Sequence, residues 1–209
     1  MKFSFEEEQL LFAEAIREML KKFCSPEIIN HFTESDSATI PELWNSLSSM
    51  GVLGMAAPTT VGGLELSDED FVLIMEELGR AGCPEPVMEH AVLSIPLIEE
   101  CNNETQFTDI IESAVNGDKR ISIGLEGHYV VGADSADYLL LFQDDLLHLV
   151  ASESIELQRQ SSVDASRRLF SVNWESSTDT IIENDPNKVR SLMEKTKLRA
   201  EVATAAQSI

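Results

Sequence analysis

The sequence predicts an α+β protein built from three successive parts. Apolar residues recur at helical spacing up to about residue 118, alternate at strand spacing up to about 185, and return to helical spacing afterwards. The net charge changes at the same places, from −18 to −7 to +3. We therefore expect a helical N-terminal domain at 1–118, a small antiparallel β-barrel or sandwich as middle domain at 119–185, and the first helix of a truncated C-terminal helical bundle at 186–209.

The first predicted helix begins with a capping box. Ser4 stands three residues before Glu7, a pair that can satisfy the free N–H groups at a helix start. Apolar residues follow at helical spacing as far as Phe23, with two lysines in the last turn, where the helix dipole favours positive charge. We interpret Pro26 as marking the end of this helix.

Four more helices are expected in the N-terminal part. One covers 39–51, with Pro41 in its first turn and Gly51 placed to end it. The other three are expected over 67–79, 86–99 and 104–116.

Short strands with turn signals between them are predicted in the middle part. Gln143-Asp144-Asp145 lies between two apolar runs and is typical of a hairpin turn. The pattern indicates a small antiparallel barrel or sandwich. The strands are expected at 121–125, 129–131, 138–142, 146–150 and 170–174.

A final helix is predicted after Asn184-Asp185-Pro186. It runs through an alanine-rich stretch to Ile209, where the sequence stops within an apolar run and without a cap. Such a helix end needs a neighbour against which to bury its apolar face. We expect the chain to be a fragment, or to require a partner.

Composition excludes several functional classes. A net charge of −22 argues against binding to nucleic acid or to anionic membranes, since both require a basic surface. No apolar stretch is long enough to span a membrane, and the N-terminus does not resemble a signal peptide. The three cysteines form an odd set without CxxC spacing, which indicates free thiols and a cytoplasmic location.

The residues that could carry chemistry form no known catalytic or metal-binding motif, and we expect no metal site. The four histidines (His31, His90, His128 and His148) lie far apart in sequence. The pairs Glu76-Glu77 and Glu99-Glu100 are expected on solvated helix faces, because adjacent helical residues do not face each other. Cys83 could be a nucleophile, but it is interpreted as a small buried thiol because no histidine or helix start is near it in sequence.

A series of motifs in the N-terminal part resembles the acyl-CoA dehydrogenase family. These motifs are Phe5-Glu6-Glu7-Glu8-Gln9, Pro41-Glu42-Leu43-Trp44, Gly51-Val52-Leu53-Gly54, Ala57 to Leu64 and Glu76-Glu77-Leu78-Gly79-Arg80. Gly62 and Gly63 would permit a tight turn. In the middle part, Val163 to Leu169 resembles a D-x-T-R-R-L segment of divergent members that form heteromeric enzymes acting on bulky acyl-CoA substrates such as sterol side chains.

The resemblance implies an FAD-dependent enzyme that converts an acyl-CoA thioester to a 2-enoyl-CoA. In the family a carboxylate removes the α-proton and the flavin accepts a hydride. The segment that matches the family's flavin-binding strand end is Leu125-Glu126-Gly127. It departs from the family pattern, because Leu125 replaces a threonine and the interval from Glu126 to Asp137 is short.

No residue of the sequence is expected to act as the catalytic base. The position aligned with the base of some family members is Ala200, and the adjacent Glu201 would point about 100° around the helix. The basic residues of this last helix could lie near flavin or CoA phosphates. We favour the alternative that they balance the acidic first part.

Two functions remain open from the sequence. The first is an acyl-CoA dehydrogenase-like flavoprotein or subunit that binds FAD and an acyl-CoA substrate within a homo- or hetero-oligomer. The second is a non-catalytic partner subunit of a heteromeric acyl-CoA dehydrogenase, which Leu125 and Ala200 favour. For these 209 residues alone we expect no turnover.

Overall fold

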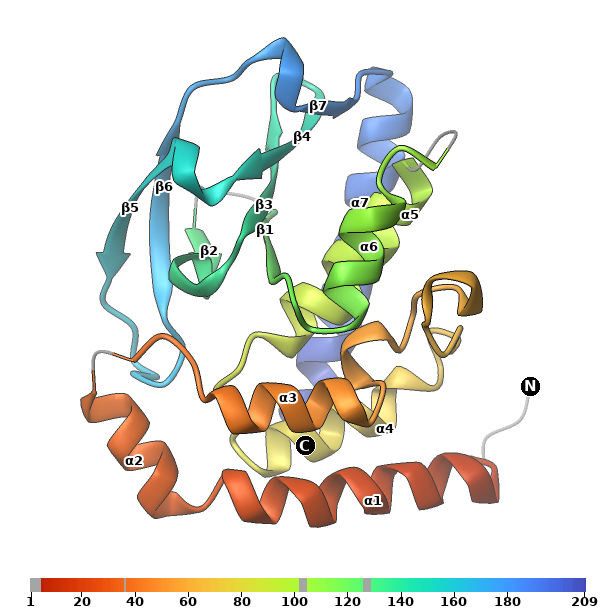
Figure 1. Ribbon diagram of the computed structural model, residues 1–209, viewed down its shortest axis with the longest axis vertical. Coiled ribbons are helices and arrows are strands. Elements are labelled where there is room, and N and C mark those ends of the chain that lie inside the picture. The colour runs from red at the N-terminus through yellow and green to blue at the C-terminus, as the bar shows by residue number, and fades with distance from the viewer. Residues whose placement is uncertain (1–4, 36, 102–104, 126–128) are drawn as a thin grey trace.

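Figure 1 shows the computed structural model, which describes residues 5–35, 37–101, 105–125 and 129–209. Its main helices are α1 (Glu7–Phe23), α2 (Pro26–Glu34), α3 (Pro41–Ser49), α4 (Phe71–Arg80), the π-helix η3 (Met88–Ser94), α5 (Ile95–Cys101), α6 (Thr108–Val115) and α7 (Pro186–Gln207). Its strands are β1 (Ile121–Gly124), β2 (Tyr129–Val131), β3 (Tyr138–Gln143), β4 (Leu146–Ala151), β5 (Ile155–Gln160), β6 (Leu169–Trp174) and β7 (Ile181–Glu183). The predicted order of helices, strands and a final helix is confirmed. Within these residues no helix is both long and apolar enough to cross a bilayer.

The ends of the first helices differ from prediction. Glu6 and Gln9 form the capping box of α1, with the Glu6 backbone N–H donating to Gln9 Oε1 at 2.6 Å. The predicted box of Ser4 and Glu7 is therefore wrong, and Ser4 lies outside the described residues. Helix α2 was not predicted at all. Pro26 is its first residue, a position where the missing N–H costs no hydrogen bond.

The loop after α3 turns tightly around its glycines. Gly51 ends the helix with φ +77°, as predicted, and Gly62 has φ +84°. A Cβ added to Gly63 would lie 2.1 Å from the Ala57 carbonyl oxygen. The close approach of the two backbone segments therefore requires glycine, which is the role expected for Gly62 and Gly63.

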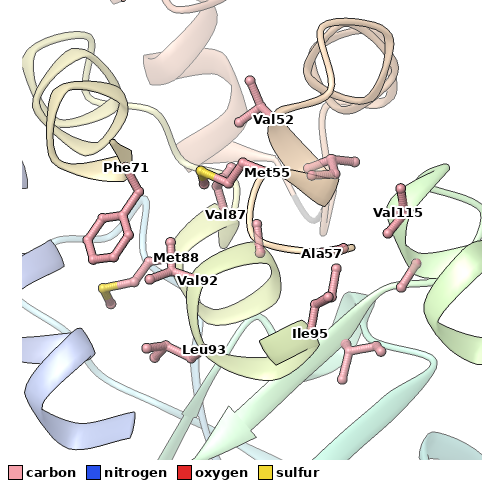
Figure 2. Packing of buried hydrophobic residues seen from close by; sticks show 14 of the residues in the cluster. Val52, Met55, Ala57, Phe71, Val87, Met88, Val92, Leu93, Ile95 and Val115 are labelled. Carbon is pink, nitrogen blue, oxygen red and sulfur yellow. The ribbon is translucent and has the colours of Figure 1, made fainter. Parts of the chain in front are cut away.

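The helix predicted over 86–99 is wound as a π-helix over Met88–Ser94 before it continues as α5. All seven residues of η3 are buried. Figure 2 shows side chains of this segment packed among those of the helical part, including Val52, Met55 and Phe71. The segment is thus the centre of the main core rather than an amphipathic surface helix.

The strands form two open sheets, in the orders β1-β3-β4-β7 and β2-β6-β5. A second core, with Val130, Leu139 and Phe170 among its members, draws residues from both sheets, so the sandwich is confirmed and the barrel is not. The hairpin turn is also confirmed, since Asp144 and Asp145 have φ of 52° and 59°. Strands β5 and β7 were not predicted.

One strand pair contradicts the predicted antiparallel arrangement. Strands β1 and β3 run parallel, with Ile121 opposite Tyr138. Between them the chain crosses to the other sheet as β2 and returns, so it enters β3 in the direction of β1. Helix α7 then packs against α4 and η3.

Candidate functional site

A cleft of about 210 Å³ lies where the helical part, the strands and α7 meet. Its walls come from the end of α4, the turn 82–86, the loop 164–167 between β5 and β6, and the last turn of α7. We call it the junction cleft. Ligand sites form preferentially where separate structural units meet, so this cleft is the candidate site.

Gly79 allows α7 to close one wall of the junction cleft. A Cβ added at Gly79 would lie 2.1 Å from the carbonyl oxygen of Gln207, so the backbones of α4 and α7 are in direct contact. Gly79 was expected to begin the end of its helix, but α4 continues to Arg80. Its role is the close packing of two helices.

An ion pair joins the strand part to the helical part at the junction cleft. Arg167, on the loop between β5 and β6, places Nη2 2.7 Å from Oε1 of Glu89 on η3. Glu89 is buried and the Arg167 side chain is partly exposed. The pair therefore fixes the position of the loop on one side of the cleft.

Cys83 lines the junction cleft but is not an activated nucleophile. It is half-buried, and contact with Cys24 together with burial raises the pKa of the Cys83 thiol. The thiol therefore stays protonated at neutral pH. The interpretation of Cys83 as a small, largely buried thiol agrees with this environment.

Sequence reasoning missed Glu85, whose carboxylate lies in the wall of the junction cleft. Its Oε1 accepts a hydrogen bond from the Ile40 backbone N–H at 2.6 Å, and its Oε2 accepts one from Arg120 Nη1 at 2.6 Å. Burial raises the pKa of Glu85, and the Arg120 charge opposes this shift. With both oxygens bonded, Glu85 holds the wall together. Its position between Pro84 and Pro86 was the available signal.

The expectation that Glu76-Glu77 lies on a solvated helix face is wrong for Glu77. Its side chain is 4% exposed and accepts two hydrogen bonds from Arg17, at 2.8 Å from Nε and 2.6 Å from Nη2. The hydrogen bond with Arg17 lowers the pKa of Glu77, which therefore remains ionised. Glu76 pairs with Arg80 instead, so the two acids do not form a catalytic pair.

Glu99 and Glu100 also point to different surroundings. Glu100 pairs with Lys195 on α7, while Oε2 of Glu99 is buried without a hydrogen-bond partner among the described residues. The solvated face expected for this pair is therefore wrong for Glu99.

The basic residues of α7 form ion pairs with acids of the chain, in agreement with the charge balance that we favoured over phosphate binding. Besides Lys195, Arg199 pairs with Asp68 at 2.9 Å, and Lys188 pairs with Glu183 at 2.6 Å. Two of these acids belong to the helical part and one to the strands. The positive charge of the helix is thus directed at the protein itself.

The buried histidines are bonded within the fold. His90 Nδ1 accepts the Ile121 N–H at 3.1 Å, so Nε2 carries the proton and donates to the Ala114 carbonyl oxygen at 3.1 Å. Burial lowers the pKa of His90 to about 4. His148 Nδ1 lies 2.9 Å from Thr180 Oγ1, and burial lowers its pKa as well. Across the described part of the chain, no group of His, Cys, Asp and Glu side chains could hold a metal ion.

The predicted flavin-binding segment is described only at Leu125. Glu126 and Gly127 lie outside the described residues. Leu125 is half-buried and packs against the main core, so its side chain offers no polar group at the end of β1. A Cβ on the preceding Gly124 would lie 3.1 Å from side chains of Leu141 and Val130. The side chains at the described end of the strand do not fit a flavin-binding contact, and we derive no chemical step through a flavin.

Ala200, the position that the resemblance aligns with the catalytic base of some family members, is not an acid. Ala200 is half-buried on α7 and packs against the core, whereas Glu201 is exposed. Glu201 does not line the junction cleft.

Helices followed by two small sheets and a long closing helix define the fold class of the acyl-CoA dehydrogenases. The family model described as the acyl-CoA dehydrogenase N-terminal domain matches residues 6–118, more than half of the chain. The chain belongs to the acyl-CoA dehydrogenase family.

Three known proteins show the extent of the similarity. "Acyl-CoA dehydrogenase IpdE2" of Mycolicibacterium smegmatis is 26% identical over 167 residues, which are 79% of this chain and 51% of that protein. Mitochondrial isovaleryl-CoA dehydrogenase of Bos taurus is 28% identical over 114 residues, 54% of this chain and 27% of that protein. The ChsE4-ChsE5 complex from Mycobacterium tuberculosis superimposes with a TM-score of 0.81 at 18% identity, covering 99% of this chain and 64% of the other. The chain spans about half the length, or less, of these two curated relatives.

Proposed function

We propose that the chain is the acyl-CoA-binding part of an acyl-CoA dehydrogenase that converts an acyl-CoA thioester to a 2-enoyl-CoA. The observation that supports this most strongly is the junction cleft, formed by all three parts of a chain from this family. We propose the same boundaries for these parts as the sequence predicted, at residues 118 and 185. The cleft of about 210 Å³ suits the thioester end of a substrate, with the rest of CoA outside it.

The chain's own residues would hold and orient this thioester. Arg167 and Glu89 fix the loop that forms one side of the cleft, and Gly79 lets α7 form another. The Arg167–Glu89 ion pair and Gly79 both position main-chain and hydroxyl groups around the cleft, including those of Thr204 on α7. Neither the ion pair nor Gly79 supplies a catalytic base. We therefore propose that the base and the main flavin contacts come from residues outside the part of the chain that the structure describes. The assembled protein would bind FAD, as members of this family do.

A bulky residue in the cleft tests this proposal. Thr204 lines the junction cleft, while the adjacent exposed Ala205 does not, so the two positions form a matched pair. We expect Thr204→Trp to weaken acyl-CoA binding by about tenfold or more and Ala205→Trp to leave it unchanged. The measurement is calorimetric titration of a panel of acyl-CoA thioesters into the complete protein with any subunit that accompanies it. Equal affinities of the two variants would reject the cleft as the site.

The second candidate is a non-catalytic subunit that completes a heteromeric acyl-CoA dehydrogenase. Leu125 packed into the core and Ala200 at the position aligned with the base support it. The fold is shared with the ChsE4-ChsE5 complex and with the Tcur3481-Tcur3483 steroid ACAD, which supports a heteromeric assembly that acts on bulky substrates such as sterol side chains.

Native mass spectrometry of the protein from its source separates the two candidates. Bound FAD on this chain, together with acyl-CoA oxidation in a separate activity assay, would support the enzyme. A complex with another dehydrogenase chain, in which only that other chain carries flavin, would support the subunit.

A further inference from the structure

Arg159 differs from the other arginines of this chain. All eight arginines lie within the described residues, and seven of them pair with a carboxylate. Arg159 is exposed at the end of β5 and has no acidic partner among those residues. The sequence has 37 acidic and 15 basic residues, so acidic partners are abundant. An arginine left unpaired in such a chain is available for an anion from outside.

Arg159 lines a surface hollow of about 400 Å³ at the loop between β5 and β6. We call it the β5–β6 hollow. Arg167 lines it too, together with Ser161 and Ser162, whose hydroxyl groups have no hydrogen-bond partner in the described part of the chain. The hollow therefore presents two guanidinium groups and two free hydroxyl donors.

Two acids that contact this loop, Asp164 and Glu89, already have hydrogen-bond partners. Asp164 Oδ1 accepts hydrogen bonds from the backbone N–H and the hydroxyl of Ser166, at 3.0 and 2.6 Å. Glu89 binds only Nη2 of Arg167. The Nε and Nη1 groups of Arg167 thus remain available, and among the described residues no ion pair joins Asp164 to Arg159.

We propose that the β5–β6 hollow binds the phosphate groups at the nucleotide end of coenzyme A. Guanidinium groups match phosphate oxygens with two parallel hydrogen bonds, and hydroxyl groups add further donors. Arg167 lines both the hollow and the junction cleft, so the pantetheine arm can pass from one to the other over this side chain. The proposal rests on the proposed function and adds where the nucleotide is held. From the sequence, the basic residues of α7 were considered near flavin or CoA phosphates but were interpreted as charge balance, and Lys188, Lys195 and Arg199 do pair with acids of the chain.

Substitution of Arg159 tests the hollow directly. The complete protein, with any subunit that accompanies it, is titrated with coenzyme A, pantetheine, adenosine 3′,5′-bisphosphate and inorganic phosphate. Arg159→Gln is compared with Arg190→Gln, which removes an exposed arginine from α7, away from the hollow. We expect Arg159→Gln to weaken binding of coenzyme A and of the bisphosphate about tenfold and to leave pantetheine binding unchanged. Arg190→Gln should change none of these affinities, and Arg159→Lys should lose part of the affinity.

Four other outcomes of these titrations would contradict the proposed site, the proposed function or the proposed ligand. If coenzyme A binds equally to wild type and Arg159→Gln, the hollow is rejected while the proposed function stands. If Arg159→Gln weakens pantetheine as much as coenzyme A, the hollow is also rejected, since pantetheine has no nucleotide. If no thioester or coenzyme A binds but the bisphosphate binds through Arg159, the proposed function fails and the hollow stands as a nucleotide site. Binding of inorganic phosphate as tight as that of the bisphosphate would reject the nucleotide as its ligand.

Discussion

Arg120 Nη1 donates a hydrogen bond to Glu85 Oε2 at 2.6 Å and so joins the start of the first strand to the turn that forms a wall of the junction cleft. The guanidinium group also lies over the Trp44 ring, 3.8 Å from its centre. The Arg120 and Glu85 side chains are 13% and 1% exposed. The cleft wall thus depends on a buried ion pair that spans two parts of the chain.

Removal of Arg120 should destabilise the protein strongly. Arg120→Ala would leave the Glu85 carboxylate buried without its cation, and we expect a loss of about 3 kcal/mol in the free energy of unfolding. Lys119→Ala is the matched control, because Lys119 pairs with Asp137 at a more exposed site and should cost less than about 1 kcal/mol. Urea unfolding of both variants measures the difference. Equal losses would contradict the role of the buried pair.

A side chain at position 79 should destabilise the folded protein. In an isolated helix, glycine to alanine stabilises by up to about 1 kcal/mol. Here the new Cβ would meet the Gln207 carbonyl oxygen, so we expect Gly79→Ala to destabilise by about 1 to 3 kcal/mol. Ser191→Ala, at an exposed position of α7, should be close to neutral. A stabilised Gly79→Ala protein in a urea titration would show that the two helices do not touch.

His90 should make stability depend on pH. Its pKa is about 4 in the folded protein against an ordinary value of 6.5, mainly because burial disfavours the charged ring. Between these values the unfolded chain binds a proton that the folded protein does not. Stability should therefore fall by about 3 kcal/mol as the pH is lowered from 6.5 to 4.

Urea unfolding at pH 6.5 and at pH 5 tests this dependence. The window avoids most of the carboxylate titration. His90→Gln should reduce the difference between the two pH values and leave the contribution of His148, whose pKa burial also lowers, while His31→Gln, at an exposed position, serves as the control. A wild-type protein that is equally stable at both pH values would contradict the prediction.

Cys101 should resist alkylation in the native protein. It is buried at the end of α5, and burial raises the pKa of its thiol to about 11. At pH 8 about one thiol in a thousand is then ionised, and it is also shielded. We expect iodoacetamide to leave Cys101 unmodified in buffer and to modify it in urea, as read by mass spectrometry of the peptides. Rapid modification in buffer would show that this end of α5 opens readily.

Local patterns predicted the fold where one face of an element is apolar or where turn residues are specific. The hairpin at Asp144-Asp145 and the helix end at Gly51 are examples. Strand β5 was missed because apolar and polar residues alternate only from Ile155 to Gln158, and most of the strand is exposed. Helix α2 was missed because Pro26 serves equally well after one helix and at the start of another.

The candidate site was predicted less well because its partners are distant in sequence. Arg120 and Glu85 are separated by 35 positions, and Arg167 and Glu89 by 78. No local pattern indicates such pairs, so an acid on a helix appears solvated until the fold supplies its cation. The orientation of β1 against β3 was missed for the same reason, since it depends on a crossover between sheets.

The contact of α4 with α7 has a consequence for synthesis on the ribosome. Helix α4 ends at Arg80, but α7 does not begin until Pro186. At translation rates of about 5 to 20 residues per second, roughly 5 to 20 seconds pass before the covering helix is made. Throughout that interval the apolar surface around Met75 and Leu78 has no native cover from α7, so it is exposed to contacts with other chains.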